Sequence, residues 1–383
     1  MRGIKNRTLL CLLLFVICSL LPAYDFGLIY DHTISQLSSG DISEFEFKGL
    51  VIPRLSGLLG NNGEFLVSAG LNYQNNPWGI VPELLEANMF FGFYGGSLMM
   101  GRMYYRDQLG FIVDGIFDGS QLRIDTGAGV FGFGAFYTGF VCKRRVNVEM
   151  TMEEYTYNNA AIEYNDFFNT YFAPARAILA LEWEHPNISQ HLRLQLGLLG
   201  QFDLTGKDIH SQYFIAKMIM PFRGFAFEVG GCFNTIQFAG SNETAFAAEF
   251  GLGRFWQTQG LSFLARHSSG YSGFLTPFLP VTTVTHGNVY SSSIAGLTMF
   301  SLDYTNRLHR TLSFSLIPAY FIDNYEGNMD PLGLELYGQI NWNPFSDIMF
   351  NIGGGVFLPS LGNVSPNSNN IWKVEANIII AFF

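Results

Sequence analysis

Apolar and polar residues alternate along nearly the whole of this chain. Between residues 173 and 183, Leu179 and Leu181 share one face of the segment, whereas Arg176 and Glu182 share the opposite face. A period of two residues is that of a β-strand with one apolar face. The same period predicts strands at 24–33, 45–59, 64–74, 84–94, 96–105, 119–126, 130–142, 170–184, 191–204, 211–220, 224–236, 244–256, 261–269, 289–304, 311–322, 332–342, 347–358 and 371–383.

The last of these segments indicates how the strands are arranged. In residues 371–383, Val374, Ile378 and Phe382 lie on one face and Glu375 lies on the other. A terminal strand leaves an exposed sheet edge unless it pairs with the first strand and closes a barrel. We therefore predict an all-β fold, a transmembrane antiparallel up-and-down β-barrel of 16–18 strands, with 18 as the best estimate, closed at this segment.

The predicted connections alternate between short and long. Short turns such as 61–63 and 221–223 are separated by long polar loops at 143–169, 270–288 and 359–370. Transmembrane barrels have short periplasmic turns and longer extracellular loops, and an even strand number puts both termini in the periplasm. Aromatic residues at the predicted periplasmic ends of the strands form a candidate interfacial girdle: Trp183, Trp256, Tyr304, Trp342 and Phe382.

The N-terminal segment predicts export. Arg2, Lys5 and Arg7 precede the apolar run 9–21, and Ala23 follows a proline. This arrangement predicts a secretory signal peptide over residues 1–23, cleaved near Ala23, and a mature barrel over residues 24–383. The apolar run is short for a membrane-spanning helix, which needs about 20 apolar residues.

Composition agrees with a membrane barrel. Hydrophobic residues make up 48% of the chain and charged residues 14%, yet no long apolar run follows residue 23. Strand alternation distributes apolar residues in this way. The formal net charge of −10 becomes −13 once the predicted signal peptide is removed, because residues 1–23 contain no acid. An acidic protein without a basic stripe is not expected to bind nucleic acid.

The sequence contains no motif for a resident metal or cofactor, so none is predicted. There is no His-Glu-x-x-His element, and no glycine-rich loop lies between a strand and a helix. Two cysteines, Cys142 and Cys232, remain after the predicted cleavage. They are far apart in the chain, and the sequence leaves open whether they form a disulfide.

The predicted signal peptide, the alternating strands and the terminal Phe382-Phe383 resemble a bacterial outer-membrane β-barrel of the porin kind. The resemblance implies the outer membrane of a diderm bacterium, contact with outer-membrane lipid, and recognition of Ile371–Phe383 by the barrel-assembly machinery. Three short elements are similar to those of substrate-selective porins such as alginate-export channels: Gly101-Arg102, Phe117-Asp118-Gly119 and Leu122-Arg123-Ile124.

Inward-facing charges are the candidate functional residues of such a pore. A barrel of this size encloses water, and arginines opposite carboxylates create a transverse field that favours some solutes over others. We therefore predict an outer-membrane porin that passes small hydrophilic or acidic solutes by passive or facilitated diffusion. A homo-oligomer is compatible with this prediction. Strand parity predicts these pore-lining residues: Arg54, Arg102, Arg123, Asp125, Arg176, Glu182, Arg193, Glu228, Glu249, Arg266 and Glu335.

The predicted loop 143–169 has two candidate positions. It begins with the basic run Lys143-Arg144-Arg145 and contains the aromatic pair Phe167-Phe168 near its end. Long loops carry function more often than short ones. The loop could fold inward as a constriction or lie over the mouth of the barrel, and the sequence leaves both open.

Two alternatives belong to other functional classes. His267 and Ser269 share a face of the predicted strand 261–269, where a base and a nucleophile can meet. This His-x-Ser element resembles that of outer-membrane phospholipases and lipid A deacylases. The resemblance implies an acyl hydrolase with a third, orienting polar residue, for which Asn288 is the candidate. The second alternative is a surface adhesin whose extracellular loops bind a partner.

Overall fold

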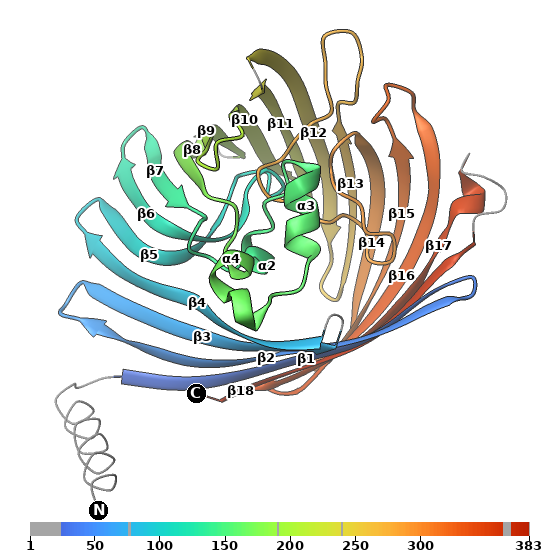
Figure 1. Ribbon diagram of the computed structural model, residues 1–383, viewed down its shortest axis with the longest axis horizontal. Coiled ribbons are helices and arrows are strands. Elements are labelled where there is room, and N and C mark those ends of the chain that lie inside the picture. The colour runs from blue at the N-terminus through green and yellow to red at the C-terminus, as the bar shows by residue number, and fades with distance from the viewer. Residues whose placement is uncertain (1–23, 76–77, 190, 239, 363–368, 383) are drawn as a thin grey trace, which may run out of the picture.

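The computed structural model describes residues 24–75, 78–189, 191–238, 240–362 and 369–382. Its eighteen strands form one closed antiparallel sheet, in which each strand pairs with the next along the chain (Figure 1). The predicted fold class and the best estimate of the strand number are confirmed. The first nine strands are β1 (Tyr24–Ser39), β2 (Ile42–Leu59), β3 (Gly63–Asn75), β4 (Trp78–Phe93), β5 (Gly96–Arg106), β6 (Asp114–Thr126), β7 (Gly129–Tyr137), β8 (Arg176–Ser189) and β9 (Leu192–Asp203).

The other nine strands return to the first one. They are β10 (Ile209–Phe222), β11 (Phe225–Phe238), β12 (Ser241–Phe255), β13 (Gln259–Ser268), β14 (Leu297–His309), β15 (Leu312–Asp323), β16 (Asp330–Phe345), β17 (Ile348–Leu358) and β18 (Ile371–Phe382). Strand β18 pairs with β1 from Leu28 opposite Phe382 to Ser39 opposite Ile371. The predicted seam is therefore the place where the barrel closes.

Alternation along the strands separates an apolar outer face from the interior. In β8, Leu179 and Leu181 are exposed on the outside, whereas Ile178 and Ala180 are buried inside the barrel. Phe382 is 59% exposed and lies on the outer face, as its phase predicted. Apolar side chains on this face suit the hydrocarbon of a bilayer. Residues 1–23 and Phe383 lie outside the described residues.

Several strand boundaries differ from the prediction, and at some of them the chain leaves the wall earlier or joins it later. The segment 289–296 belongs to a loop, and β14 begins only at Leu297. Strand β7 ends at Tyr137, and a long connection to β8 follows. This connection contains helices α2 (Lys143–Val146), α3 (Met152–Asn159) and α4 (Phe167–Tyr171), which alternation does not predict. None of the helices in the described part of the chain is long and apolar enough to cross a membrane.

Three long connections fold into the barrel and build an apolar core there. They are 107–113, 138–175 and 269–296, and Figure 1 shows the helices of the second within the ring of strands. Their buried residues Ile112, Val146 and Val281 belong to one cluster with wall residues such as Ile178 and Tyr213. The loop 143–169 is therefore inside the barrel, which decides between the two positions that the sequence left open.

The wall has a gap in its backbone hydrogen bonding between β4 and β5. Strands β4 and β5 pair only from Ala87 opposite Arg102 to Phe93 opposite Gly96. Residues 78–86, the half of β4 nearest the long loops, therefore have no strand partner on that side. An unpaired edge inside a membrane protein must be satisfied by other groups.

Side chains take the place of the missing strand partner at this gap. Two come from the connection 138–175, and the third is an arginine of β5 at the point where the pairing ends. The Tyr164 hydroxyl accepts from the Ile80 N–H (3.0 Å), Tyr171 donates to the Pro82 carbonyl (3.1 Å), and Arg102 donates to the Leu84 carbonyl (3.0 Å). The connection 138–175 thus seals the wall as well as filling the interior.

Candidate solute pathway

A buried ion pair fixes the connection 138–175 against the wall. The guanidinium of Arg176 lies 2.5 Å from Glu154 on α3 and 3.8 Å from Asp203 on β9, and it has no exposed area. Glu154 also accepts from the N–H groups of Met150 and Thr151, which closes a capping box at the start of α3. Arg176 was predicted to line the pore. It is instead buried, and it holds a loop in place.

A second carboxylate anchors the connection 269–296. Glu335 on β16 is fully buried and accepts from the N–H groups of Asn288, Val289 and Tyr290 at 2.7–2.9 Å. Glu335 was also predicted to line the pore, and the structure places it beneath this loop. Because three backbone donors converge on one carboxylate, the loop has a defined position at this point.

A third carboxylate organises the connection 107–113. Asp107 accepts from the N–H groups of Leu109, Gly110, Ile112 and Val113 at 2.7–3.0 Å. Burial raises the pKa of Asp107, and the four donors oppose that rise. The loop therefore folds around its own acidic side chain, and its apolar residues point into the core.

Beside the three packed loops, space remains along the wall formed by β1, β2, β3 and β18. Two cavities of about 290 and 510 Å³ lie there, and both are lined by Lys48. The first lies between α2 and the wall and is lined by Asp31, Thr33, Lys48, Gly49, Leu50, Asn72, Gln74, Arg144 and Arg145. The second lies towards the long loops and includes Ser35, Glu44, Glu46, Thr285, Asn288 and Lys373.

The cations of this region differ in whether they have a partner. Arg145 pairs with the buried Glu83, and Lys373 pairs with Glu375 at 2.9 Å. Lys48 and Arg144 form no ion pair within the part of the chain that the structure describes. Their charges are therefore available to solutes in the first cavity, where Asp31 supplies the opposite sign.

These basic residues were absent from the predicted pore-lining set, although the sequence contains two signals for them. Lys48 has the same strand phase as Arg54, which was in the set. Arg144 and Arg145 form a basic run in a long loop, but a loop residue has no strand parity. Only the inward fold of the connection 138–175 brings them opposite β1 and β3.

A further group of predicted residues meets at the end of the barrel with the short turns. Arg123, Glu182 and Arg193 line a cavity of about 370 Å³ beneath the connection 107–113. Arg193 lies 2.9 Å from Glu184, which lines the same cavity. This group has the mixed charges that were predicted for the interior. Asp125 is exposed in the same strand as Arg123.

The remaining predicted charges on β10–β13 form a network. Glu249 is nearly buried and lies 3.0 Å from Lys217 and 3.3 Å from Arg266. Lys217 lies 3.2 Å from Glu228 as well. The Arg266 guanidinium also reaches His286 of the connection 269–296 at 3.3 Å. Burial, with a smaller effect of Arg266, lowers the pKa of His286 to about 3.

Arg102 occupies a different position from the predicted one. It forms a two-pronged ion pair with Asp118 at 2.7 and 2.8 Å and donates to the Phe140 carbonyl at 2.7 Å. Its Nη1 donates to the Leu84 carbonyl on the unpaired edge of β4. Arg102 follows Gly101, whose φ of +114° interrupts the regular strand. Strand parity therefore does not predict the direction of the Arg102 side chain. Arg102 closes the wall and is nearly buried.

The structure does not assemble the set proposed for an acyl hydrolase. The Ser269 hydroxyl donates to the Thr276 carbonyl at 2.8 Å, and the His267 Nδ1 faces the Thr298 hydroxyl at 2.7 Å. Asn288 contacts Glu335 inside the barrel. Ser269 therefore ties the connection 269–296 to β12, His267 contacts the neighbouring strand β14, and the two do not form a base and nucleophile pair.

The predicted girdle and the two cysteines have clear positions. Trp183 donates from Nε1 to the Ala128 carbonyl in the β6–β7 turn at 2.9 Å, next to the short turns. The other predicted members also lie towards that end: Trp256 directly follows β12, and the rest are on β14, β16 and β18. Cys142 and Cys232 are buried and form no disulfide. Across the described ranges, no group of three or more His, Cys, Asp or Glu could hold a metal ion.

Comparisons with known proteins find similarity of fold without detectable similarity of sequence. No protein-family model and no curated protein matches the chain. Similar solved structures include OccK2 (OpdF) of Pseudomonas aeruginosa in complex with glucuronate, at 10% identity and a TM-score of 0.67, covering 95% of this chain and 99% of that one. OccAB1 of Acinetobacter baumannii matches at 10% identity and a TM-score of 0.61, covering 95% and 98%.

A third match, OpdL of Pseudomonas aeruginosa, has 9% identity and a TM-score of 0.64 and covers 94% of this chain and 99% of that one. These matches cover nearly the whole of each partner chain, so the likeness extends over the complete barrel. At identities near 10% they establish the fold alone, which is a closed barrel of eighteen strands.

Proposed function

We propose that this protein is an outer-membrane porin of a diderm bacterium, which passes small hydrophilic solutes by diffusion. The short turns and both chain ends would face the periplasm, and the long loops would face outward. The strand Ile371–Phe383 would be the segment that the barrel-assembly machinery recognises. The apolar outer face and the fold shared with solved outer-membrane channels support this proposal.

The observation that carries the proposal is the pair of adjoining cavities at Lys48. Three loops fill much of the interior, yet polar and charged side chains line the space that they leave along β1–β3 and β18. An interior that served only to stabilise the barrel would be expected to close around apolar residues, as the opposite side does.

The charges in the first of these cavities favour small organic anions. Lys48 and Arg144 form no ion pair among the described residues, and a cation that lines a cavity attracts anions more strongly than it would in bulk water. Asp31 opposite them would orient a solute that also carries hydrogen-bond donors. The fold relative OccK2 was solved with glucuronate, a sugar acid of this class.

Reconstitution in planar bilayers tests the proposal. We expect discrete conductance steps, and a reversal potential under a potassium chloride gradient that indicates preference for chloride. Liposome swelling should be faster with gluconate than with an uncharged sugar alcohol of the same size. Protein that inserts as a folded barrel but shows no conductance steps would contradict the proposal.

A further inference from the structure

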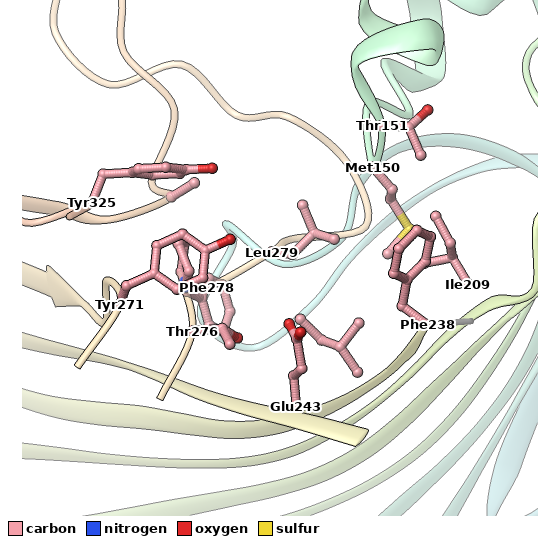
Figure 2. Close-up of a pocket in the computed structure, with 13 residues that line it drawn as sticks. Met150, Thr151, Ile209, Phe238, Glu243, Tyr271, Thr276, Phe278, Leu279 and Tyr325 are labelled. Atoms are coloured by element: carbon pink, nitrogen blue, oxygen red, sulfur yellow. The ribbon is translucent and has the colours of Figure 1, made fainter. Parts of the chain in front are cut away.

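A separate cavity lies at the outer mouth of the barrel. It has a volume of about 360 Å³ and lies between the start of α3, the connection 269–296 and the ends of β10–β12 (Figure 2). None of its lining residues lines the cavities at Lys48. Four aromatic rings surround the space, from Phe238, Tyr271, Phe278 and Tyr325.

The floor of this cavity is closed. Ile209, Ile236 and Phe278 are at most 5% exposed and belong to the apolar core that the inward loops form with the wall. A molecule that enters from the outer side therefore meets packed side chains and has no open passage below it. The cavity is suited to holding a ligand and is distinct from the space proposed for solute passage.

Backbone hydrogen bonds hold the walls of the cavity in place. The Tyr271 N–H donates to the Tyr325 carbonyl at 2.8 Å, so the two loops that carry these rings are tied together. The Thr276 N–H donates to the Thr244 carbonyl at 2.9 Å, which fixes the connection 269–296 on the end of β12. A preformed cavity loses little conformational entropy when a ligand binds.

The third wall is held by the capping box of α3. Met150 and Thr151 line the cavity, and Glu154 accepts from the N–H groups of both. The same carboxylate pairs with the buried Arg176. This wall is therefore anchored to β8, and the cavity does not depend on an unsupported loop.

One acidic side chain gives the cavity its charge. Glu243 on β12 points up into the space, with Tyr271 on one side of it and Phe238 on the other (Figure 2). No hydrogen bond or ion pair joins its carboxylate to another described residue, and no Lys, Arg or His is among the lining residues. A carboxylate surrounded by aromatic faces is complementary to an organic cation.

We propose that this cavity binds a small organic cation that carries an aromatic or branched apolar group. The cationic head would lie near Glu243 and the ring faces of Tyr271 and Tyr325, and the apolar group would lie over Phe278 and Phe238. An anionic ligand would meet the unpaired carboxylate of Glu243 and bind weakly. The site goes beyond the proposed channel function and does not rest on it.

The experiment measures binding of benzyltrimethylammonium to the full-length protein in detergent micelles by isothermal titration calorimetry. Benzenesulfonate and benzyl alcohol serve as the anionic and neutral ring probes. We expect the ammonium probe to bind most tightly, Glu243→Gln to weaken it by about tenfold, and Tyr271→Ala to weaken it by roughly fivefold. The matched control is Glu326→Gln, an exposed acid of the neighbouring loop outside the cavity, which should leave the affinity unchanged.

Equal binding of benzyltrimethylammonium by the wild type and Glu243→Gln would overturn the proposal, as would equally tight binding of benzenesulfonate. Far-UV circular dichroism establishes that each variant is folded. Bilayer conductance of Glu243→Gln should match that of the wild type, because Glu243 lies outside the cavities at Lys48. A protein that binds the probe without conducting would leave this inference standing and contradict the channel function, and a protein that conducts without binding would do the reverse.

Discussion

The two sides of this barrel have similar apolar outer faces, but their inner faces differ in polarity. Along β5–β12 much of the inner face is apolar, with Phe117, Ile178 and Tyr213 packed against the inward loops. Along β1–β3 and β18 it is polar, with Lys48 and Asn72 lining open space. We call these the packed side and the open side. The outer faces of both sides are suited to lipid. The difference between the inner faces therefore reflects what lies inside the barrel, packed loops on one side and open space on the other.

Charged residues follow the same division. On the packed side, Arg176 and Glu249 are each in an ion pair and are buried or nearly buried. On the open side, Lys48 and Arg144 have no ion-pair partner among the described residues. Arg176 therefore holds a loop on the packed side, whereas Lys48 and Arg144 are available to a solute on the open side.

The largest effect is expected from breaking the buried pair of the packed side. In Glu154→Gln, Arg176 would keep only the more distant Asp203, and an uncompensated buried charge costs about 3–5 kcal/mol. The connection 138–175 should then leave its place more often. Hydrogen exchange of this segment should accelerate, and trypsin should cleave at Arg144 and Arg145.

A matched substitution on the open side sharpens that comparison. Arg144→Gln removes a charge that has no ion-pair partner among the described residues, so exchange of the connection 138–175 should remain within the error of the wild type. Equal acceleration in Glu154→Gln and Arg144→Gln would show that the two sides do not differ in the way proposed.

The next effect concerns the outer face that both sides share. Phe382 lies on that face and Phe383 falls in the inward phase of the sequence. Phe382→Ala should therefore reduce barrel insertion more than Phe383→Ala, by a free energy of about 1.5–3 kcal/mol for one apolar aromatic side chain. Heat-modifiable mobility in gel electrophoresis measures the folded fraction, and the reverse ranking would contradict the register of β18.

Acid pH should loosen the packed side at His286. Its pKa is near 6.5 when solvated and is lowered to about 3 in place, so the undocked loop binds more protons between these values. Docking of the connection 269–296 is therefore fully favoured above pH 6.5 and weakens as pH falls towards 3, by about 2 kcal/mol at pH 5. Protonation would also place a second positive charge beside Arg266.

Hydrogen exchange of residues 269–296, corrected for the intrinsic pH dependence, checks this prediction. Exchange should be faster at pH 5 than at pH 7.5 in the wild type. His286→Gln should remove most of the difference, because glutamine does not titrate. A wild type with the same protection at both pH values would exclude His286 as the titrating group.

The smallest effect is expected at the gap between β4 and β5. Tyr171→Phe removes one hydrogen bond to the free edge of β4 and leaves the ring in place, at a cost of about 0.5–1.5 kcal/mol. Tyr155→Phe is the matched control, because Tyr155 is exposed on α3 and its hydroxyl makes no hydrogen bond among the described residues. Thermal unfolding should separate the two variants if side chains seal the wall.

Alternation along the chain was sufficient to predict the barrel, because lipid imposes the same period on every strand. It predicted all the strands, including the seam between β1 and β18. It failed at residues 289–296, a loop segment whose Val289 and Tyr290 pack inside the barrel as residues of a strand would. Periodicity alone does not separate these two uses of apolar residues.

The site was harder to predict. Strand parity predicts whether a side chain points into the barrel, but it does not predict which loop packs against that side chain. Arg176 and Glu335 do point inward, but loops bury both of them. The sequence holds one signal that would have helped. Strands of the packed side are apolar on both faces, as Ile178 and Leu179 in β8 show, and a doubly apolar strand predicts that something packs against its inner face.

The most direct test of the difference between the two sides is the charge preference of the channel after neutralising the open side. The measurement is the reversal potential of the double variant Lys48→Gln/Arg144→Gln under a potassium chloride gradient, with Arg310→Gln in the β14–β15 turn as the control. We predict that the double variant loses most of the preference for chloride while the control keeps it. An unchanged reversal potential in the double variant would contradict the assignment of the solute pathway to the open side.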